Sequence, residues 1–337
     1  MKYSFRNDYC TIGHPNILNS LVKNIDQTNV GYGFDEVTLK LEETVRKMLD
    51  LDVSIHLVIG GTMANLLCIS KSLKPYEAVI AVETGHINVH ETGAIEGTGH
   101  AIIRVKGNDG KVTKEDVEQV MATYADCHMV KPGMVYITNS TEIGTIYNKC
   151  ELASLYETCK KHGLYLFLDG ARLPIALTTN ESDMTIKDIA EYTDIFYIGG
   201  AKNGLPVGEM IIVKNKEINN NFKYHIKNRG GMVNKGFFLA YMFSEYLKDD
   251  FYLELAKNAN QCALYLKEQL IEKNIEILYN NPTNQIFVRL DNSKIEQLSK
   301  DYDFEMWEQG KSKSVIRLVT SFITTKEACD SLLSDII

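Results

Sequence analysis

The strongest constraint on the fold is an alternation of short apolar runs and amphipathic stretches over residues 53–213. Stretches with helical spacing, such as Lys114–Tyr124 and Glu151–His162, separate the runs. Continuous apolar strands separated by helices are typical of a mostly parallel sheet that is covered on both faces. We therefore predict an α/β fold with a seven-stranded sheet between helices, its strands at Ile55–Ile59, Ala78–Val82, Ala101–Val105, Met134–Thr138, Leu164–Leu168, Ile195–Ile198 and Met210–Val213.

The segments on either side of this region follow other patterns. The first 40 or so residues are predicted to be irregular, because Pro15 and Gly31-Tyr32-Gly33 interrupt any long helix, and helical spacing begins at Asp35. Met232–Lys273 is predicted to be long and helical, and to link two lobes. We expect an N-terminal arm at 1–40, a large cofactor-binding domain at 41–235, and a linking helix with a small domain at 236–337.

The C-terminal segment predicts a small α+β lobe. Short apolar runs alternate there with amphipathic stretches. The expected strands are Ile275–Leu278, Gln285–Leu290, Glu305–Trp307 and Val315–Thr320, and the expected helices are Ser293–Lys300 and Thr325–Ile336.

Charge and composition disfavour several classes of protein. The net charge is −8 and no basic block is present, which disfavours a dedicated nucleic-acid binder. No run approaches the ~18 apolar residues of a membrane span, and the sequence MKYSFRNDYC lacks the apolar centre of a signal peptide. The seven cysteines are scattered without a C-x-x-C pair, which is typical of reduced thiols. We expect a cytoplasmic protein.

A turn of small residues follows the first predicted strand. Gly60-Gly61-Thr62 lies between this strand and a helix expected to start near Met63. Glycines let the backbone approach a ligand closely, and the free N–H groups of a helix start attract phosphate. Thr62 is expected to cap the helix and to add a hydroxyl donor. The alternative is an ordinary strand-to-helix turn.

An acid and a lysine follow two later strands. Asp169 ends a very apolar strand, where burial is costly unless the carboxylate has a partner. A cationic partner would hold the carboxylate ionised. In the simpler interpretation, Asp169 pairs with Arg172 or caps the next helix. Lys202 lies in a loop of small residues, Gly199–Gly204, which leaves space beside its amine for a planar group. Its alternative is a surface lysine in a flexible loop.

One ligand requires all three groups. Pyridoxal 5′-phosphate needs a helix start for its phosphate, a carboxylate for its pyridine nitrogen and a lysine for its aldehyde. The interval between Asp169 and Lys202 is 202 − 169 = 33 residues, enough for one crossover and a return to the same edge of the sheet. The three features together therefore predict this cofactor.

The sequence resembles the threonine aldolase / β-eliminating lyase family, which are fold-type I pyridoxal-phosphate enzymes. It is most similar to the low-specificity L-threonine aldolases. The resemblance runs over nearly the whole chain. It is carried by Phe5-Arg6-Asn7-Asp8, Tyr32-Gly33, Gly61-Thr62-Met63-Ala64-Asn65, His86-Ile87, Asp169-Gly170-Ala171-Arg172, Lys202 with Pro206-Val207-Gly208, and Arg317-Leu318-Val319-Thr320.

The resemblance implies roles at the cofactor. Lys202 would form the Schiff base, Asp169 would pair with the pyridinium nitrogen, and Gly61 with Thr62 would hold the phosphate. His86 would stack on the cofactor ring and is a candidate for proton transfer. The alternative for His86 is a cap of the helix that follows.

The resemblance also implies roles at the substrate and at a subunit interface. Arg172 and Arg317 would lie near the cofactor and the substrate carboxylate, and Asn7 replaces a serine of some relatives on the substrate side. In the alternative interpretation, Arg317 lies at the edge of a sheet and faces water. The site would lie between two subunits of a homodimer or homotetramer, with Tyr32 reaching the neighbour's cofactor. Arg229 and Lys235 are weaker candidates for the same role.

One stretch departs from the family. Many threonine aldolases carry a histidine where this chain has Asn139-Ser140-Thr141-Glu142, so Glu142 is the candidate base at the substrate hydroxyl. No metal site is predicted, because His86 and His90 lack the glutamate of an H-E-x-x-H zinc motif.

The expected activity is cleavage of the Cα–Cβ bond of a β-hydroxy-α-amino acid, such as L-threonine or L-allo-threonine, to glycine and an aldehyde. The alternatives are β-elimination or transamination of another amino acid with the same cofactor. A third is a non-catalytic protein that binds a nucleotide or a phosphorylated sugar.

Overall fold

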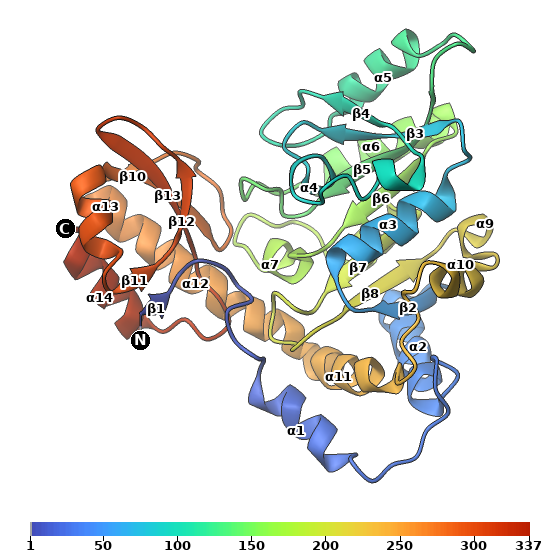
Figure 1. Ribbon diagram of the computed structural model, residues 1–337, viewed down its shortest axis with the longest axis horizontal. Coiled ribbons are helices and arrows are strands. Elements are labelled where there is room, and N and C mark those ends of the chain that lie inside the picture. The colour runs from blue at the N-terminus through green and yellow to red at the C-terminus, as the bar shows by residue number, and fades with distance from the viewer. Residues whose placement is uncertain (1) are drawn as a thin grey trace.

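The computed structural model describes residues 2–337 and is built around a seven-stranded sheet (Figure 1). The strand order is β2-β8-β7-β6-β5-β3-β4, and β8 alone runs antiparallel to its neighbours. All seven predicted runs lie in this sheet, which confirms the α/β prediction. The strands are β2 (Ser54–Val58), β3 (Glu77–Val82), β4 (Ile102–Val105), β5 (Lys131–Thr138), β6 (Tyr165–Asp169), β7 (Ile195–Gly199) and β8 (Glu209–Val213).

Helices cover both faces of this sheet because its strands are apolar on both sides. One face packs against α3 (Gly61–Ser72) and α10 (Phe222–Asn228). The other face packs against α2 (Glu36–Leu49), α5 (Lys114–Thr123), α6 (Lys149–His162) and α11 (Phe237–Leu247). Shorter helices are α4 (His86–Val89), α7 (Leu173–Leu177), α8 (Ile186–Glu191) and α9 (Lys216–Asn219), with a 3-10 turn at Glu96–Thr98.

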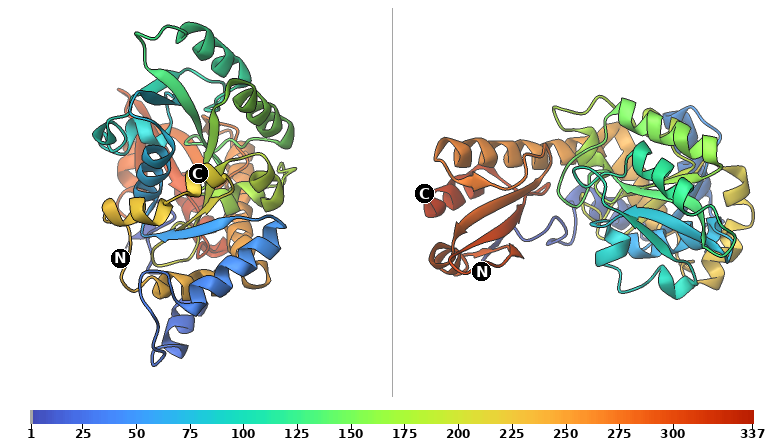
Figure 2. Two further views of the ribbon diagram at one scale, coloured as in Figure 1. Left: turned by 90° about the vertical axis from the view of Figure 1, so that its right-hand side faces the viewer. Right: turned by 90° about the horizontal axis from the view of Figure 1, so that it is seen from above.

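The predicted continuous helix over Met232–Lys273 is wrong in one respect, because it is two helices. After α11 the chain makes a 3-10 turn at Lys248–Asp250, and α12 (Phe251–Glu272) follows. Asp249 and Asp250 have positive φ angles of 52° and 58°, a conformation that aspartate tolerates better than most residues. The bend directs α12 away from the large sheet and into the C-terminal lobe, as Figure 2 shows from above.

The C-terminal lobe confirms the predicted α+β pattern. Its antiparallel sheet has the order β12-β13-β10-β9. The strands are β9 (Glu276–Ile277), β10 (Gln285–Asp291), β12 (Glu305–Glu308) and β13 (Lys313–Val319), and they pack with α12, α13 (Asn292–Leu298) and α14 (Lys326–Ile336). Both chain termini lie at this lobe in Figure 1.

The N-terminal arm contains more structure than its sequence predicts. β1 (Tyr3–Ser4) pairs in parallel with β11 (Tyr302–Asp303), which ties the start of the chain to the small lobe. α1 (Pro15–Lys23) begins at a proline, and the side chain of His14 accepts a hydrogen bond from Asn16 N–H as its cap. Pro15 therefore occupies the first position of a helix. A backbone N–H at this position has no partner within the helix, so a proline loses nothing there.

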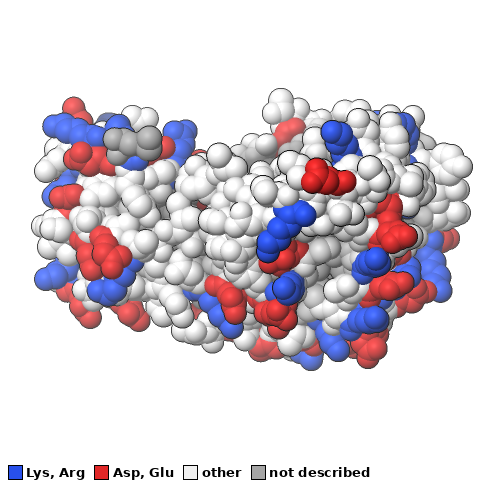
Figure 3. Space-filling view, turned by 90° about the horizontal axis from the view of Figure 1, so that it is seen from below, with Lys and Arg blue, Asp and Glu red and all other residues white. Residues whose placement is uncertain are grey.

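Charged side chains of both signs are interspersed on the face that Figure 3 shows, which is the side on which α1 lies in Figure 1. Broad uncharged areas separate them. Among residues 2–337, no helix combines the length and the apolar character needed to cross a membrane.

Candidate active site

A cavity of about 210 Å³ lies at the carboxyl ends of the parallel strands. Several elements meet there: the start of α3, the start of α4, and the ends of β5, β6 and β7. Seven of the predicted site residues line this cavity, namely Gly61, Thr62, His86, Glu142, Asp169, Arg172 and Lys202. Ligands of open α/β sheets bind at this edge.

Asp169 is a buried carboxylate that accepts four hydrogen bonds. Tyr197 Oη donates at 2.5 Å, Tyr136 Oη at 2.7 Å, Asn65 Nδ2 at 2.9 Å and the N–H of Ala171 at 3.0 Å. Burial alone would raise the pKa of Asp169, but the nearby His86 and these hydrogen bonds outweigh it and lower the pKa. Asp169 is therefore held as an anion at the cavity wall.

Arg172 does not pair with Asp169, so that simpler interpretation of the acid is wrong. Its Nε donates to Asp8 Oδ2 at 2.7 Å and its Nη2 to Asp8 Oδ1 at 3.0 Å. Asn284 Nδ2 also donates to Asp8, at 3.0 Å, and both charged side chains are buried. This cluster joins the N-terminal arm, the loop after β6 and the small lobe.

Lys202 lies in the cavity wall and not on the outer surface. Its loop leaves the end of β7, and Asp8, Glu142 and Asp169 act on its amine through their charge and not through hydrogen bonds. Burial lowers the pKa of Lys202, and the nearby positive charge of Arg172 lowers it further. A lower pKa increases the fraction of neutral amine, which is the nucleophilic form.

The start of α3 has the geometry that binds phosphate. α3 begins at Gly61, its cap residue is Gly60, and no side chain caps its first N–H groups. Thr62 is the second helical residue and not the cap, so that expectation is wrong. A Cβ added at Gly61 would lie 3.1 Å from Tyr197 Oη, a tight contact with the hydroxyl that donates to Asp169.

His86 is the first residue of α4, and its side chain does not cap the helix. Its Nδ1 lies 2.8 Å from Glu91 Oε1. Asn65 Nδ2 donates to the same oxygen at 2.7 Å, so hydrogen bonds link Asp169, Asn65, Glu91 and His86. Burial opposes a charge on His86, but Glu91 and the more distant acids Glu142 and Asp169 raise its pKa.

A second cavity of about 300 Å³ adjoins the first, and His86, Glu142, Arg172 and Lys202 line both. The second cavity also contains Arg317, Asn7, Arg6 and Glu305. It therefore combines positively charged groups with two carboxylates. A site of this kind suits a small zwitterion such as an amino acid.

Arg317 lies on β13 between β12 and β10, so it is not an edge residue that faces water. Its guanidinium forms an ion pair with Glu305 and donates to Gln285 Oε1 at 3.1 Å. It also lies over the ring of Trp307, at 5.6 Å from the ring centroid, and its buried Nε has no acceptor among residues 2–337.

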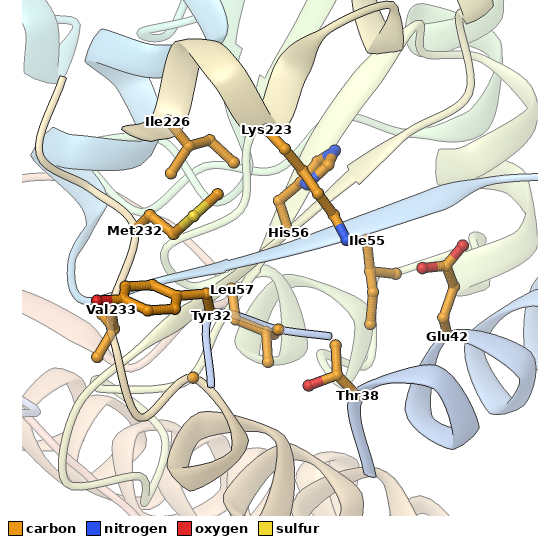
Figure 4. A pocket seen from close by; sticks show the side chains of 12 residues that line it. Tyr32, Thr38, Glu42, Ile55, His56, Leu57, Lys223, Ile226, Met232 and Val233 are labelled. Carbon is orange, nitrogen blue, oxygen red and sulfur yellow. The ribbon is translucent and has the colours of Figure 1, made fainter. Parts of the chain in front are cut away.

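Tyr32 is the predicted site residue that this chain does not bring to Lys202. It lines a separate small pocket with Thr38, His56 and Met232 (Figure 4). Its side chain is partly exposed, and the amine of Lys227 lies 4.5 Å from the centroid of its ring. Arg229 and Lys235 are likewise exposed and line neither cavity beside Lys202. Asn7 does reach the second cavity, and its Oδ1 accepts a hydrogen bond from Tyr9 N–H.

Several residues of the site carry little signal in the sequence. Tyr136 and Tyr197 lie within apolar strands, where an aromatic residue gives no signal of a hydrogen-bonding role. Asn65 lies in the Gly61–Asn65 string, so the resemblance pointed to it without a role. Glu91 stands between His90 and Thr92 without a sequence signal, and the only signal at Glu209 is an acid before an apolar run.

Comparisons with known proteins agree with this geometry. The profile of the family described as beta-eliminating lyase matches residues 4–293. The low specificity L-threonine aldolase of Pseudomonas aeruginosa is 32% identical over 273 residues, which cover 79% of this chain and 78% of that protein. The low specificity L-threonine aldolase of Saccharomyces cerevisiae is 25% identical over 264 residues, which cover 77% and 67%.

Solved structures show the same fold. A threonine aldolase of Leishmania major is 40% identical, with a TM-score of 0.97, and the match covers 99% of this chain and 98% of that one. An aspartate aminotransferase variant of Thermus thermophilus is 14% identical, with a TM-score of 0.74, and the match covers 99% and 90%. The second likeness concerns the fold alone, and together they confirm the predicted fold-type I architecture.

Proposed function

The chain belongs to the β-eliminating lyase family, and from this we propose that it cleaves the Cα–Cβ bond of a β-hydroxy-α-amino acid with pyridoxal 5′-phosphate. The products are glycine and an aldehyde, and L-threonine and L-allo-threonine are the proposed substrates. One observation carries the proposal: Lys202, Asp169 and the uncapped start of α3 meet at a single cavity. The names of the relatives support the choice of reaction.

The cavity fits the cofactor. Its wall contains a buried hydroxyl, Ser140 Oγ, that has no hydrogen-bond partner among residues 2–337, as well as the free N–H groups of the first turn of α3. Unpaired buried polar groups are uncommon in native proteins, so an unpaired hydroxyl on the wall of this cavity supports a ligand there. We propose that Gly61 and Thr62 hold the phosphate, Asp169 the ring nitrogen, Lys202 the aldehyde carbon, and His86 the face of the ring.

When bound, pyridoxal 5′-phosphate supplies a protonated ring that accepts the electron pair left at the substrate Cα. Asp169 contributes a fixed negative charge that keeps a proton on the ring nitrogen, because its hydrogen bonds hold it ionised. Lys202 contributes an amine whose lowered pKa favours the neutral form. The side chains that donate hydrogen bonds to Asp169 therefore also help to keep the ring nitrogen protonated.

We propose that the second cavity binds the substrate. Arg317 binds the carboxylate, because a guanidinium matches both of its oxygens. Holding the carboxylate fixes the orientation of the Cα–Cβ bond, and such positioning lowers a barrier by several kcal/mol. Glu142 takes the proton of the substrate hydroxyl, since it lines both cavities at the place where many relatives have a histidine. His86 is the second group in reach for proton transfer.

We propose a homodimer, or a homotetramer made of two such dimers, with sites at the subunit interface. Support comes from apolar side chains that are more than half exposed on the N-terminal arm and α2, namely Ile12, Val22, Ile25, Val30, Phe34 and Leu39. Tyr32 lies among them and is proposed to reach the neighbour's cofactor. We also propose a cytoplasmic location, which the seven unpaired cysteines support.

Product analysis tests the proposed reaction. The purified protein with pyridoxal 5′-phosphate is given threonine, allo-threonine, serine and cysteine in turn. The proposal expects glycine and acetaldehyde from the first two substrates, and no turnover by the Lys202→Ala variant. Pyruvate with ammonia from serine or cysteine, without glycine from threonine, would establish β-elimination, and amino-group transfer to a keto acid would establish an aminotransferase.

A further inference from the structure

The first residue of β8 is a buried glutamate that the proposed reaction does not use. Glu209 is 5% exposed, and the residues that follow it in the strand, 210–213, are all apolar. Glu209 pairs with Val58 at the end of β2 on one side and with Gly199 at the end of β7 on the other. It therefore lies at the edge of the sheet where α3 begins and the loop of Lys202 leaves.

The side chain of Glu209 lies on the face of the sheet that α3 covers. Successive side chains of a strand point to opposite faces, so Glu209 shares a face with Ile211 and Val213. Both of these pack in one cluster with Leu67 of α3. In agreement, Glu209 lines the cavity together with Gly61 and Thr62, the first turn of that helix.

Only one oxygen of Glu209 is used within the protein. Oε2 accepts a hydrogen bond from the N–H of Gly200 at 3.0 Å, while Oε1 has no hydrogen-bond partner among residues 2–337. Lys202 acts on it through its charge alone, without a hydrogen bond. A buried carboxylate without a hydrogen-bonded cation is costly, so the protonated form is favoured at this place.

The surrounding groups fix the charge of Glu209. Burial raises the pKa of Glu209 to about 8 and the negative charge of Asp169 adds to this rise, while the hydrogen bond from Gly200 N–H and the charge of Lys202 oppose it. Tyr197 on β7 and Tyr246 on α11 also face it, and both stay neutral in this range because burial raises their pKa values. A pKa raised in this way favours the protonated form of Glu209 near neutral pH and the ionised form in alkaline solution.

We propose that protonated Glu209 is part of the phosphate site, where its O–H donates a hydrogen bond to a phosphate oxygen of the cofactor beside the N–H groups of α3. The inference rests on the proposed function, because that function supplies a ligand with a phosphate. Ionised Glu209 has no proton to donate and places another negative charge beside the phosphate. The phosphate is therefore held less tightly as Glu209 ionises.

Equilibrium dialysis of the apo-protein tests this directly, with pyridoxal 5′-phosphate and pyridoxal as the two probes. Both offer the same aldehyde to Lys202 and the same ring to Asp169, so the ratio of their dissociation constants isolates the phosphate. The ratio is measured from pH 7 to pH 9.5, where the phosphate stays a dianion because its second pKa is about 6.

We define the advantage of the phosphorylated probe as the dissociation constant of pyridoxal divided by that of pyridoxal 5′-phosphate. This advantage should fall about tenfold or more from pH 7 to pH 9.5, which is the size of one lost charge-assisted hydrogen bond. In Glu209→Gln the advantage should not vary with pH, because the amide keeps a donor for the phosphate and an acceptor for Gly200. Glu36→Gln, which changes an exposed carboxylate on α2, is the matched control and should behave like the unchanged protein.

The outcomes separate this inference from the function on which it rests. A pH-independent advantage in the unchanged protein, or the same pH dependence in Glu209→Gln, would overturn the role of Glu209 while the cofactor proposal stands. Failure of both probes to bind at any pH would overturn the cofactor proposal itself. If Glu209→Gln does not fold, the pH dependence of the unchanged protein still decides.

Discussion

The buried pair of Asp8 and Arg172 gives a stability prediction that follows from geometry alone. Asp8→Asn keeps the shape of the side chain but removes its charge, and it leaves the guanidinium of Arg172 buried without a counter-charge. Removing one partner of a buried pair costs about 3–5 kcal/mol. The loss should be near the upper end, because Asn284 also donates to Asp8 and three segments of the chain meet there.

Urea unfolding of the apo-protein, followed by circular dichroism, measures this loss. The matched control is Asp303→Asn, because Asp303 pairs with Arg6 at 3.6 Å on the surface, where both side chains are about half exposed. Such exposed pairs contribute only about 0–1 kcal/mol. The double variant Asp8→Leu with Arg172→Met should be less destabilised than Asp8→Asn, since it leaves no buried charge.

The pH dependence of this pair has a definite sign. Burial would raise the pKa of Asp8, but the charge and hydrogen bonds of Arg172 lower it below the value of the unfolded chain. The stabilisation is therefore complete above a pH of about 4, where the unfolded carboxyl is ionised, and is lost as the pH falls toward the folded pKa. The reasoning is refuted if Asp8→Asn costs no more than Asp303→Asn at pH 7.

Three further predictions concern the site and its surroundings. Asp169→Ala should keep the cofactor weakly and slow turnover roughly 100-fold or more, because the fixed charge at the ring is lost; unchanged kcat in a steady-state assay would contradict this. Glu142→Gln should lower kcat at least about 100-fold with little change in KM, as expected for a lost general base, and an equal loss in KM alone would speak against that role. Burial lowers the pKa of His56 to about 4, so only the unfolded chain takes up this proton between about pH 6.5 and pH 4, and stability is lost as the pH falls through that range. His56→Gln should abolish about 2 kcal/mol of the loss between pH 7 and pH 5 in urea unfolding, and an equal loss in both proteins would refute the assignment.

The large sheet was predictable because its signal is local. Each strand is an apolar run bounded by turn residues, and burial on both faces requires that pattern. The bend at Lys248–Asp250 was not predicted, because apolar spacing continues across it and the two aspartates adopt positive φ angles without a glycine. The pairing of β1 with β11 was also missed, since a strand of two residues has no periodicity.

The site was predictable where its chemistry follows the ends of strands. Asp169 and Lys202 were found because parallel strands bring their carboxyl ends to one edge of the sheet. Tyr136 and Tyr197 were missed because their hydroxyls meet Asp169 only through the order β5-β6-β7, which no local pattern gives. Asp8 was missed as the partner of Arg172 because the two residues are 164 positions apart.

Borohydride reduction of the protein with pyridoxal 5′-phosphate, followed by peptide mapping, tests most directly whether Lys202 is the amine that holds the cofactor. The label should be found on the peptide that contains Lys202, and the Lys202→Ala variant should take up none. Labelling of a different lysine in the unchanged protein, or equal labelling of the variant, would show that the amine, the carboxylate of Asp169 and the start of α3 do not form one cofactor site.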